Sequence, residues 1–256
     1  MVTAGISKAG RYKDMGKQIR LDKYLADMSV GTRSEVKKYI RNGRILVDGR
    51  VVKTPESKVD PEASQVLWDN HPVTYEEQVY YMLHKPAGVI TATEDPRQST
   101  VLDLITDKKR KDLFPVGRLD KDTTGLLLIT NDGQLAHDLL APGRHVDKVY
   151  EAVIDGCVTE KDAALFEAGL VVDEEFTALP ARLTILSAGP ISRVRIVIRE
   201  GKYHQIKRMF EAVGKEVTAL KRLQMGPLVL DEALEPGQYR RLTEAEIAAL
   251  RGGRQA

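Results

Sequence analysis

The sequence predicts an α+β protein, in which a small helix–helix–hairpin domain at residues 17–60 precedes a larger domain at residues 78–251. The larger domain is expected to hold a mostly antiparallel mixed sheet flanked by helices. Three observations favour this fold class. An Asp-Gly pair at Asp48 separates two short β-branched runs, which is a strong hairpin signal. After residue 78, strand and helix patterns mix without a strict βαβ rhythm, and the charge changes sign near residue 60.

The small domain is predicted element by element. Residues 1–16 contain Gly, Ser and Lys without a periodic apolar pattern, which predicts a disordered leader. Apolar residues at helical spacing predict a first helix, at Leu21, Tyr24, Leu25 and Met28. A second helix begins after Thr32, which can form a capping box with Glu35, and ends at Asn42-Gly43. The hairpin at 45–52 completes the domain.

The larger domain is expected to follow a polar, proline-containing linker at residues 61–77, and to end before a short tail at 252–256. Strand signals lie near 79–83, 88–92, 126–130, 149–154, 182–186, 194–199 and 216–222. Helix signals lie near 134–140, 160–168, 203–213 and 244–251.

The charge distribution points to a polyanionic partner for the small domain. Residues 1–60 hold 14 Lys and Arg against 7 Asp and Glu, and the remaining 196 residues hold 25 against 30. Basic residues spaced by four share one face of the second predicted helix, and the row continues into the hairpin: Arg33, Lys37, Arg41 and Arg44. Rows of phosphates would offset the repulsion between these like charges. A merely solvated basic face is the alternative.

Several classes of site and location are disfavoured. The five histidines show no metal-ligand spacing, and one cysteine cannot build a zinc site, so no metal is expected. No phosphate-binding loop or nucleophile elbow is found, which favours a reaction without a cofactor. The single Cys157 is expected to be a buried, inert thiol. No apolar stretch is long enough for a membrane span. We therefore expect a cytoplasmic monomer.

Two segments carry groups that could act chemically. The loop Gly117 to Gly125 holds Asp120 and Asp122 beside basic residues, and it leads directly into an apolar strand. A turn rich in Asp, Thr and Gly often only makes its own hydrogen bonds. The second segment, Gly201 to Phe210, follows an arginine-rich strand and suits phosphate groups. A structural ion-pair network is its alternative.

Together these segments resemble the pseudouridine synthases of the RsuA type. Four motifs stand in the order of that family: Lys85-Pro86-Ala87-Gly88, Gly117-Arg118-Leu119-Asp120-Lys121-Asp122-Thr123-Thr124-Gly125-Leu126, Lys148-Val149-Tyr150, and Gly201 to Phe210. Residues 19–60 resemble the S4-like RNA-binding domain of many such enzymes. The resemblance covers about Ile19 to Leu250. His84 departs from the family pattern, in which Asn is more usual before the Lys-Pro turn.

The resemblance implies an activity and roles for individual residues. It implies isomerisation of a uridine in ribosomal RNA to pseudouridine, without a cofactor, on a base flipped out of its stack. Asp120 matches the essential aspartate, Tyr150 would stack on the target base, and Lys207 would pair with Asp120, with Arg208 as the competitor for that place. Arg118 is expected to contact RNA, as is Arg208. The His204-Gln205 form of the last motif, with Lys207, favours small-subunit rRNA, either free or within an assembly intermediate of the ribosome.

Two alternatives stay open at this stage. One is a pseudouridine synthase acting on large-subunit rRNA. The other is a non-catalytic RNA-binding protein of ribosome assembly that keeps the fold, which the presence of Asp120 disfavours.

Overall fold

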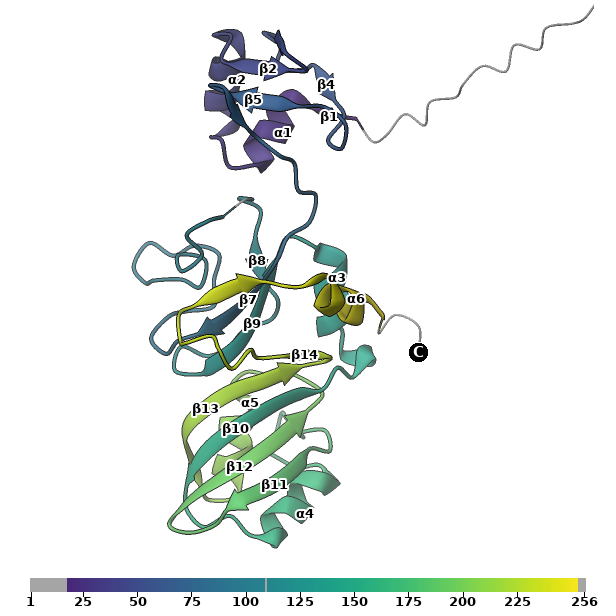
Figure 1. The fold of residues 1–256 in the computed structure, drawn as a ribbon. Coiled ribbons are helices and arrows are strands. Elements are labelled where there is room, and N and C mark those ends of the chain that lie inside the picture. Colours follow the sequence, from purple (N-terminus) through teal and green to yellow (C-terminus); the bar gives the residue numbers. More distant parts are fainter. Residues whose placement is uncertain (1–17, 109, 253–256) are drawn as a thin grey trace, which may run out of the picture. The chain divides into compact units, whose positions relative to one another are not determined.

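The computed structural model describes residues 18–108 and 110–252, so the predicted leader and most of the predicted tail lie outside the described residues. The chain divides into two compact units (Figure 1). Of the described residues, the small unit holds those up to Glu77 together with Lys108, Arg110 and Lys111. The large unit holds Gln78–Asp107 and the chain from Asp112 onward.

The small unit packs two helices against a sheet. Helix α1 (Leu21–Asp27) is followed by α2 (Arg33–Arg41), and the predicted capping box closes the start of α2. There the Thr32 N–H donates to the Glu35 carboxylate at 2.7 Å, and the Thr32 hydroxyl accepts from the Glu35 N–H. The expected hairpin is formed by β2 (Ile45–Val47) and β3 (Arg50–Val51), and a separate ladder joins β1 (Ile19–Arg20) to β4 (Lys58–Val59). Leu21, Leu25, Val36, Ile40 and Ile45 are fully buried.

The prediction of a linker at residues 61–77 is wrong. This segment forms β5 (Val66–Trp68) and β6 (His71–Pro72), which complete a four-stranded sheet in the order β3-β2-β5-β6. β5 pairs antiparallel with β2, and Val66 is buried in the core of the small unit. The Tyr75 ring packs on that of Tyr24, with centroids 5.0 Å apart. The segment is ordered because β5 pairs with β2, about 20 residues earlier in the chain. The polar composition of residues 61–77 does not reveal this pairing.

The large unit is built on a nine-stranded sheet, whose main path runs β11-β12-β10-β13-β9-β7-β15. Its strands are β7 (Tyr80–Lys85), β8 (Phe114–Pro115), β9 (Thr124–Thr130), β10 (Lys148–Asp155), β11 (Arg182–Ser187), β12 (Ile191–Ile198), β13 (Glu216–Met225), β14 (Leu228–Val229) and β15 (Tyr239–Arg241). The β13–β9 pair is parallel, and the other named pairs of this sheet are antiparallel. The predicted α+β class with a mostly antiparallel mixed sheet is confirmed.

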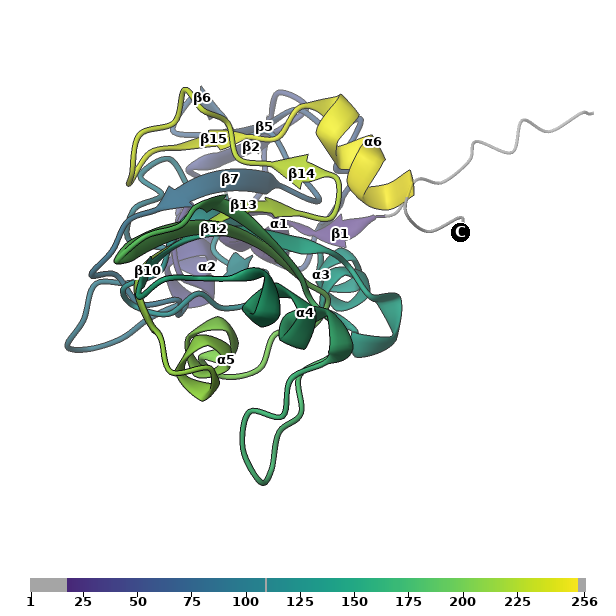
Figure 2. The same cartoon turned by 90° about the horizontal axis from the view of Figure 1, so that it is seen from below.

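Helices cover the sheet on two sides. Helices α4 (Glu160–Ala168) and α5 (Gln205–Ala212) bring Phe166 and Phe210 into one hydrophobic cluster, where their rings lie 4.9 Å apart. Figure 2 shows α5 below β10, β12 and β13. Helices α3 (Gly133–Leu140) and α6 (Glu244–Gly252) pack on the second cluster, with β7, β9 and β14.

Most predicted elements of the large unit are present, and two expectations fail. The four predicted helices correspond to α3, α4, α5 and α6. Residues 88–92 form no strand but make a single bridge from Ile90 to Thr100. Cys157 is exposed, contrary to the expectation of burial. None of the helices within residues 18–252, residue 109 apart, has the length and apolar character needed to cross a membrane.

Candidate active site

Asp120 lies in a loop that connects β8 to β9. From Gly125 to Thr130, β9 is buried, so the loop is anchored to the rigid centre of the sheet. Gly125 has φ +103°, and a Cβ at this position would overlap the backbone of Arg222 on β13. Glycine is therefore required where the loop enters the strand. The guanidinium of Arg222 is buried there and donates through Nε to the Leu126 carbonyl at 2.7 Å.

Lys85 holds the Asp120 loop through hydrogen bonds to backbone carbonyls. Its ammonium, at the end of β7, is fully buried and donates to the carbonyls of Pro86 at 3.0 Å, Lys121 at 3.2 Å and Thr123 at 2.9 Å. Burial lowers the pKa of Lys85 to about 8, against the opposing field of the two loop carboxylates. The carbonyls of Lys121 and Thr123 lie on either side of Asp122 in the sequence. Lys85 therefore sets the backbone path directly after Asp120.

Two more contacts hold the same loop. The Thr91 hydroxyl donates to the Leu119 carbonyl at 2.7 Å and accepts from the Leu119 N–H at 3.1 Å. The Gly88 N–H donates to the Lys121 carbonyl at 2.8 Å. His84, which departs from the family pattern, is buried, and its Nδ1 lies 2.6 Å from the Leu234 carbonyl. The Lys-Pro turn is thus built directly against the Asp120 loop.

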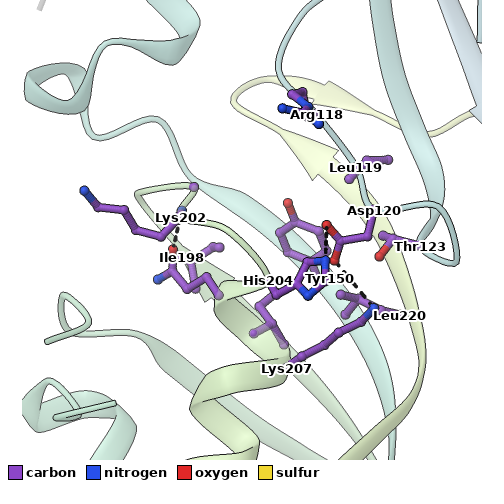
Figure 3. Close-up of a pocket in the computed structure, with 13 residues that line it drawn as sticks. Arg118, Leu119, Asp120, Thr123, Tyr150, Ile198, Lys202, His204, Lys207 and Leu220 are labelled. Carbon is purple, nitrogen blue, oxygen red and sulfur yellow. Dashed lines mark hydrogen bonds and ion pairs between the residues drawn. The ribbon is translucent and has the colours of Figure 1, made fainter. Parts of the chain in front are cut away.

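The Asp120 carboxylate lies between two side chains of the last motif (Figure 3). His204 Nε2 is 3.6 Å from Oδ1 of Asp120, and Lys207 Nζ is 3.6 Å from Oδ2. Lys207 makes shorter contacts with Asp122, at 2.6 and 2.7 Å, and this hydrogen bond holds the pKa of Asp122 below its usual range. The expected pairing of Lys207 with Asp120 is therefore present as the longer of two contacts.

Tyr150 and Asp120 line the same pocket. Tyr150 lies on β10 and is 6% exposed, so its ring is held in place as part of the pocket wall. The pocket has a volume of about 70 Å³, which is room for several water molecules. Its lining combines residues of the Asp120 loop, the sheet and the last motif: Arg118, Leu119, Asp120, Thr123, Tyr150, Ile198, Gly201, Lys202, His204, Gln205, Ile206, Lys207 and Leu220.

The turn before α5 is held by Gln205. This buried side chain donates to the Glu200 carboxylate at 2.8 Å and accepts from the Lys202 N–H at 3.1 Å. Glu200 also accepts from the Leu179 N–H at 2.8 Å. His204 occupies the N-cap position of α5 with φ +48°. The turn thus directs His204 and Lys207 toward the same carboxylate.

Two of the arginines expected to bind RNA lie in the large unit, and they differ in their surroundings. Arg208 forms an ion pair with Asp173, and its guanidinium lies 5.2 Å from the centre of the Phe176 ring. Arg208 is therefore directed away from Asp120, in contrast to Lys207. Arg118 lines the pocket, is exposed, and has no carboxylate within ion-pair distance among the described residues.

The predicted basic face of the small unit is only partly free. Arg33, Lys37 and Arg41, here called the α2 basic row, make no ion pair with any carboxylate in the described part of the chain. Arg44 instead forms an ion pair with Asp69, and its guanidinium lies 4.6 Å from the centre of the Tyr39 ring. The α2 basic row therefore holds three charges without an ion pair among the described residues, and it does not extend to Arg44.

Two family models match the chain. The model of the RNA pseudouridylate synthase family matches residues 79–212, and that of the S4 domain matches residues 19–64. The chain belongs to the RNA pseudouridylate synthase family. It is therefore an enzyme that isomerises uridine in RNA, with an RNA-binding domain of the S4 type ahead of the catalytic unit.

Related proteins match this RNA pseudouridylate synthase over nearly its whole length. An uncharacterized RNA pseudouridine synthase of Bacillus subtilis is 47% identical over 91% of the chain and 98% of its own length. The ribosomal small subunit pseudouridine synthase A of Escherichia coli K12 is 39% identical over 91% of the chain and 100% of its own. A crystal structure of a pseudouridylate synthase aligns with a TM-score of 0.64 at 37% identity, covering 91% of this chain and 99% of that one.

Sequence reasoning did not identify two residues of the site of this synthase. His204 stood within a recognised motif, but its approach to Asp120 depends on the left-handed turn at the start of α5. Lys85 stood in the Lys-Pro turn, whose contact with the Asp120 loop joins segments 36 and 38 residues apart. No group of three or more His, Cys, Asp or Glu that could hold a metal occurs among the residues that the structure describes.

Proposed function

We propose that this synthase isomerises a specific uridine of small-subunit ribosomal RNA, with Asp120 as the catalytic carboxylate. The substrate class is supported by the relatives at 39–42% identity that are named ribosomal small subunit pseudouridine synthase A, in Escherichia, Salmonella, Yersinia and Vibrio. The observation that carries the role of Asp120 is its position in the pocket, between His204 and Lys207.

The reaction needs an ionised carboxylate at Asp120. The bond between uracil N1 and ribose C1′ must break, the base must turn, and a new bond must form between C5 and C1′. Asp120 would either attack C1′ or assist formation of a glycal, and both roles require its negative charge. Lys207 places its ammonium 3.6 Å from Asp120 as a counter-ion, and its two hydrogen bonds to Asp122 engage the second acid of the loop.

Tyr150 is proposed to support the flipped base. Taking a base out of its stack costs a few kcal/mol. Stacking on an aromatic ring returns about 1–3 kcal/mol per base. The buried position of Tyr150 supports this role, because a ring that is already fixed loses little conformational entropy when the base binds. The base would displace the several waters for which the pocket has room.

Basic residues are proposed to bind the RNA backbone at two places. Arg118, exposed at the pocket and without a carboxylate partner among the described residues, suits a phosphate next to the target uridine. Arg208 is proposed as a weaker contact, because Asp173 already neutralises it. In the small unit the α2 basic row is proposed to contact rRNA, and Arg44, paired with Asp69, contributes less.

The proposed reaction is an isomerisation within one nucleotide. It involves no net redox change and no external energy source, so it requires no cofactor. Since the proposed substrate is ribosomal RNA, either free or in an assembly intermediate, we propose that the enzyme acts in the cytoplasm. We also propose that one copy suffices, because Asp120, Tyr150 and Lys207 all come from one chain.

Mapping pseudouridine in the ribosomal RNA of cells that lack the gene tests this proposal. We expect one pseudouridine of small-subunit rRNA to disappear and to return when the purified enzyme is added to that RNA. Parallel reactions on large-subunit rRNA are the matched control. Loss of a large-subunit pseudouridine, with small-subunit rRNA unchanged, would overturn the substrate assignment.

A further inference from the structure

His204 is held in a backbone conformation that residues other than glycine rarely adopt. Its φ of +48° and ψ of +31° are left-handed, at the N-cap of α5, where its side chain makes no cap hydrogen bond. This conformation costs about 1–2 kcal/mol for a residue other than glycine. The imidazole consequently enters the pocket, where Nε2 lies 3.6 Å from Oδ1 of Asp120.

Aromatic stacking fixes the plane of the imidazole. The Tyr203 ring lies 3.8 Å from the His204 ring at an interplanar angle of 16°, while Tyr203 itself is 75% exposed. Figure 3 shows the edge of the His204 ring directed at Asp120, beside Tyr150. Within the described part of the chain no hydrogen bond occupies either ring nitrogen. In the neutral tautomer that carries its hydrogen on Nδ1, the lone pair is on Nε2, the nitrogen that lies 3.6 Å from Asp120.

The proposed isomerisation leaves one proton to be removed. Once C5 has bonded to C1′, it carries both the ribose and its original hydrogen, and the uracil ring is restored only when that proton leaves. Once C1′ is bonded to C5, Asp120 is no longer bonded to the ribose, and a carboxylate is in general a weaker base than a neutral imidazole. Lys207 carries protons already and is held by both oxygens of Asp122. Histidine is the residue type best suited to accept a proton near neutral pH.

We propose that Nε2 of His204 accepts the proton from C5 of the target base, an inference that rests on the proposed function. The C5–H bond breaks, and its electron pair forms the C5–C6 double bond. The N1–C6 π pair returns to N1, which takes up a proton from water, while the imidazolium gives its proton to water. Atoms and charges balance, because one proton leaves C5 and one reaches N1.

Two variants separate proton transfer from positioning. Asn tolerates the left-handed backbone and keeps an amide that can hydrogen-bond to Asp120, but it cannot accept a proton. Gly relieves the backbone and leaves space for added imidazole. His145→Asn is the matched control, since His145 is exposed, has the same φ of +48° and does not line the pocket. Unfolding curves verify that each variant is folded.

The readout is the single-turnover rate on RNA with hydrogen or deuterium at uracil C5. We expect His204→Asn to be about 10²- to 10⁴-fold slower, with a larger deuterium effect than the parent. Added imidazole should partly restore His204→Gly, and His145→Asn should match the parent. His204→Asn with the parent's rate, or a slow His204→Asn with an unchanged deuterium effect and no rescue of His204→Gly, would overturn the inference alone. A parent enzyme that forms no pseudouridine in ribosomal RNA would overturn the proposed function with it.

Discussion

Replacing Lys85 with Met should weaken both the fold and the reaction. The ammonium joins three carbonyls, of Pro86, Lys121 and Thr123, at 2.9–3.2 Å. Hydrogen bonds from a charged donor contribute about 1.5–3 kcal/mol each. Met also removes the cost of burying a charge, so we expect a net loss of about 2–4 kcal/mol in the free energy of unfolding. A loop that shifts by about 1 Å at Asp120 should slow the chemical step about 100-fold.

The assay pairs urea unfolding with tritium release from RNA labelled at uracil C5, under single-turnover conditions with saturating enzyme. Lys121→Met is the matched control, because Lys121 is an exposed lysine of the same loop whose ammonium donates to Gln98. We expect this control to keep the parent's unfolding free energy. A Lys85→Met enzyme with the parent's rate and unfolding free energy would refute the idea that Lys85 positions the Asp120 loop.

The pH dependence of stability gives an independent test of the buried charge of Lys85. Its pKa is about 8 in the folded protein and rises to the ordinary 10.5 on unfolding. Between these values the unfolded chain binds more protons, so the cost of burying the Lys85 charge falls as the pH rises from 8 to 10.5, and the free energy of unfolding increases by up to about 1.4 kcal/mol per pH unit. The stability of the parent relative to Lys85→Met should therefore increase over this range. A difference that stays constant would contradict the lowered pKa.

Three further predictions concern Gly125 at the start of β9, the basic residues Lys207 and Arg208, and the α2 basic row of the small unit. Gly125→Ala should lower the free energy of unfolding by more than about 3 kcal/mol, since its Cβ would overlap the neighbouring strand; an unfolding midpoint in urea equal to the parent's would show that the strands can separate. Lys207→Met should slow single-turnover chemistry, while Arg208→Met should mainly weaken RNA binding; the reverse result would exchange their roles. Replacing the α2 basic row by Gln should lower rRNA affinity and reduce the salt slope by about 2–3, and an unchanged slope would make the row a solvated face.

Local signals explain which elements of the fold were predicted. The capping box at Thr32 and Glu35, and the alternation of Val194, Ile196 and Ile198, are determined by neighbours in the sequence. β5 was missed because Val66–Trp68 is a short run between polar residues, and pairing with β2 holds it. Contacts between distant segments do not appear in a local pattern.

In the active site, too, local patterns predicted the residues but not the contacts between distant segments. The sequence placed Asp120, Tyr150 and Lys207 in separate motifs, and the pocket brings all three together. The sequence did not show that Lys207 makes its shorter contacts with Asp122. Both acids lie in one loop, two residues apart, and a local pattern cannot show which of them a distant lysine approaches more closely. Arg44 was predicted to continue the basic row into the hairpin, and a local pattern does not show its ion pair with Asp69, which lies 25 residues later across the sheet.

The role of Asp120 is tested most directly by Asp120→Asn. This change is nearly isosteric and removes the charge that either mechanism requires, while the Lys85 contacts that hold the loop are unaffected. The measurement is tritium release from rRNA labelled at uracil C5 in a single turnover, with RNA affinity measured in parallel. We predict no detectable release and the parent's affinity. A rate within tenfold of the parent would contradict the assignment of Asp120 as the catalytic carboxylate.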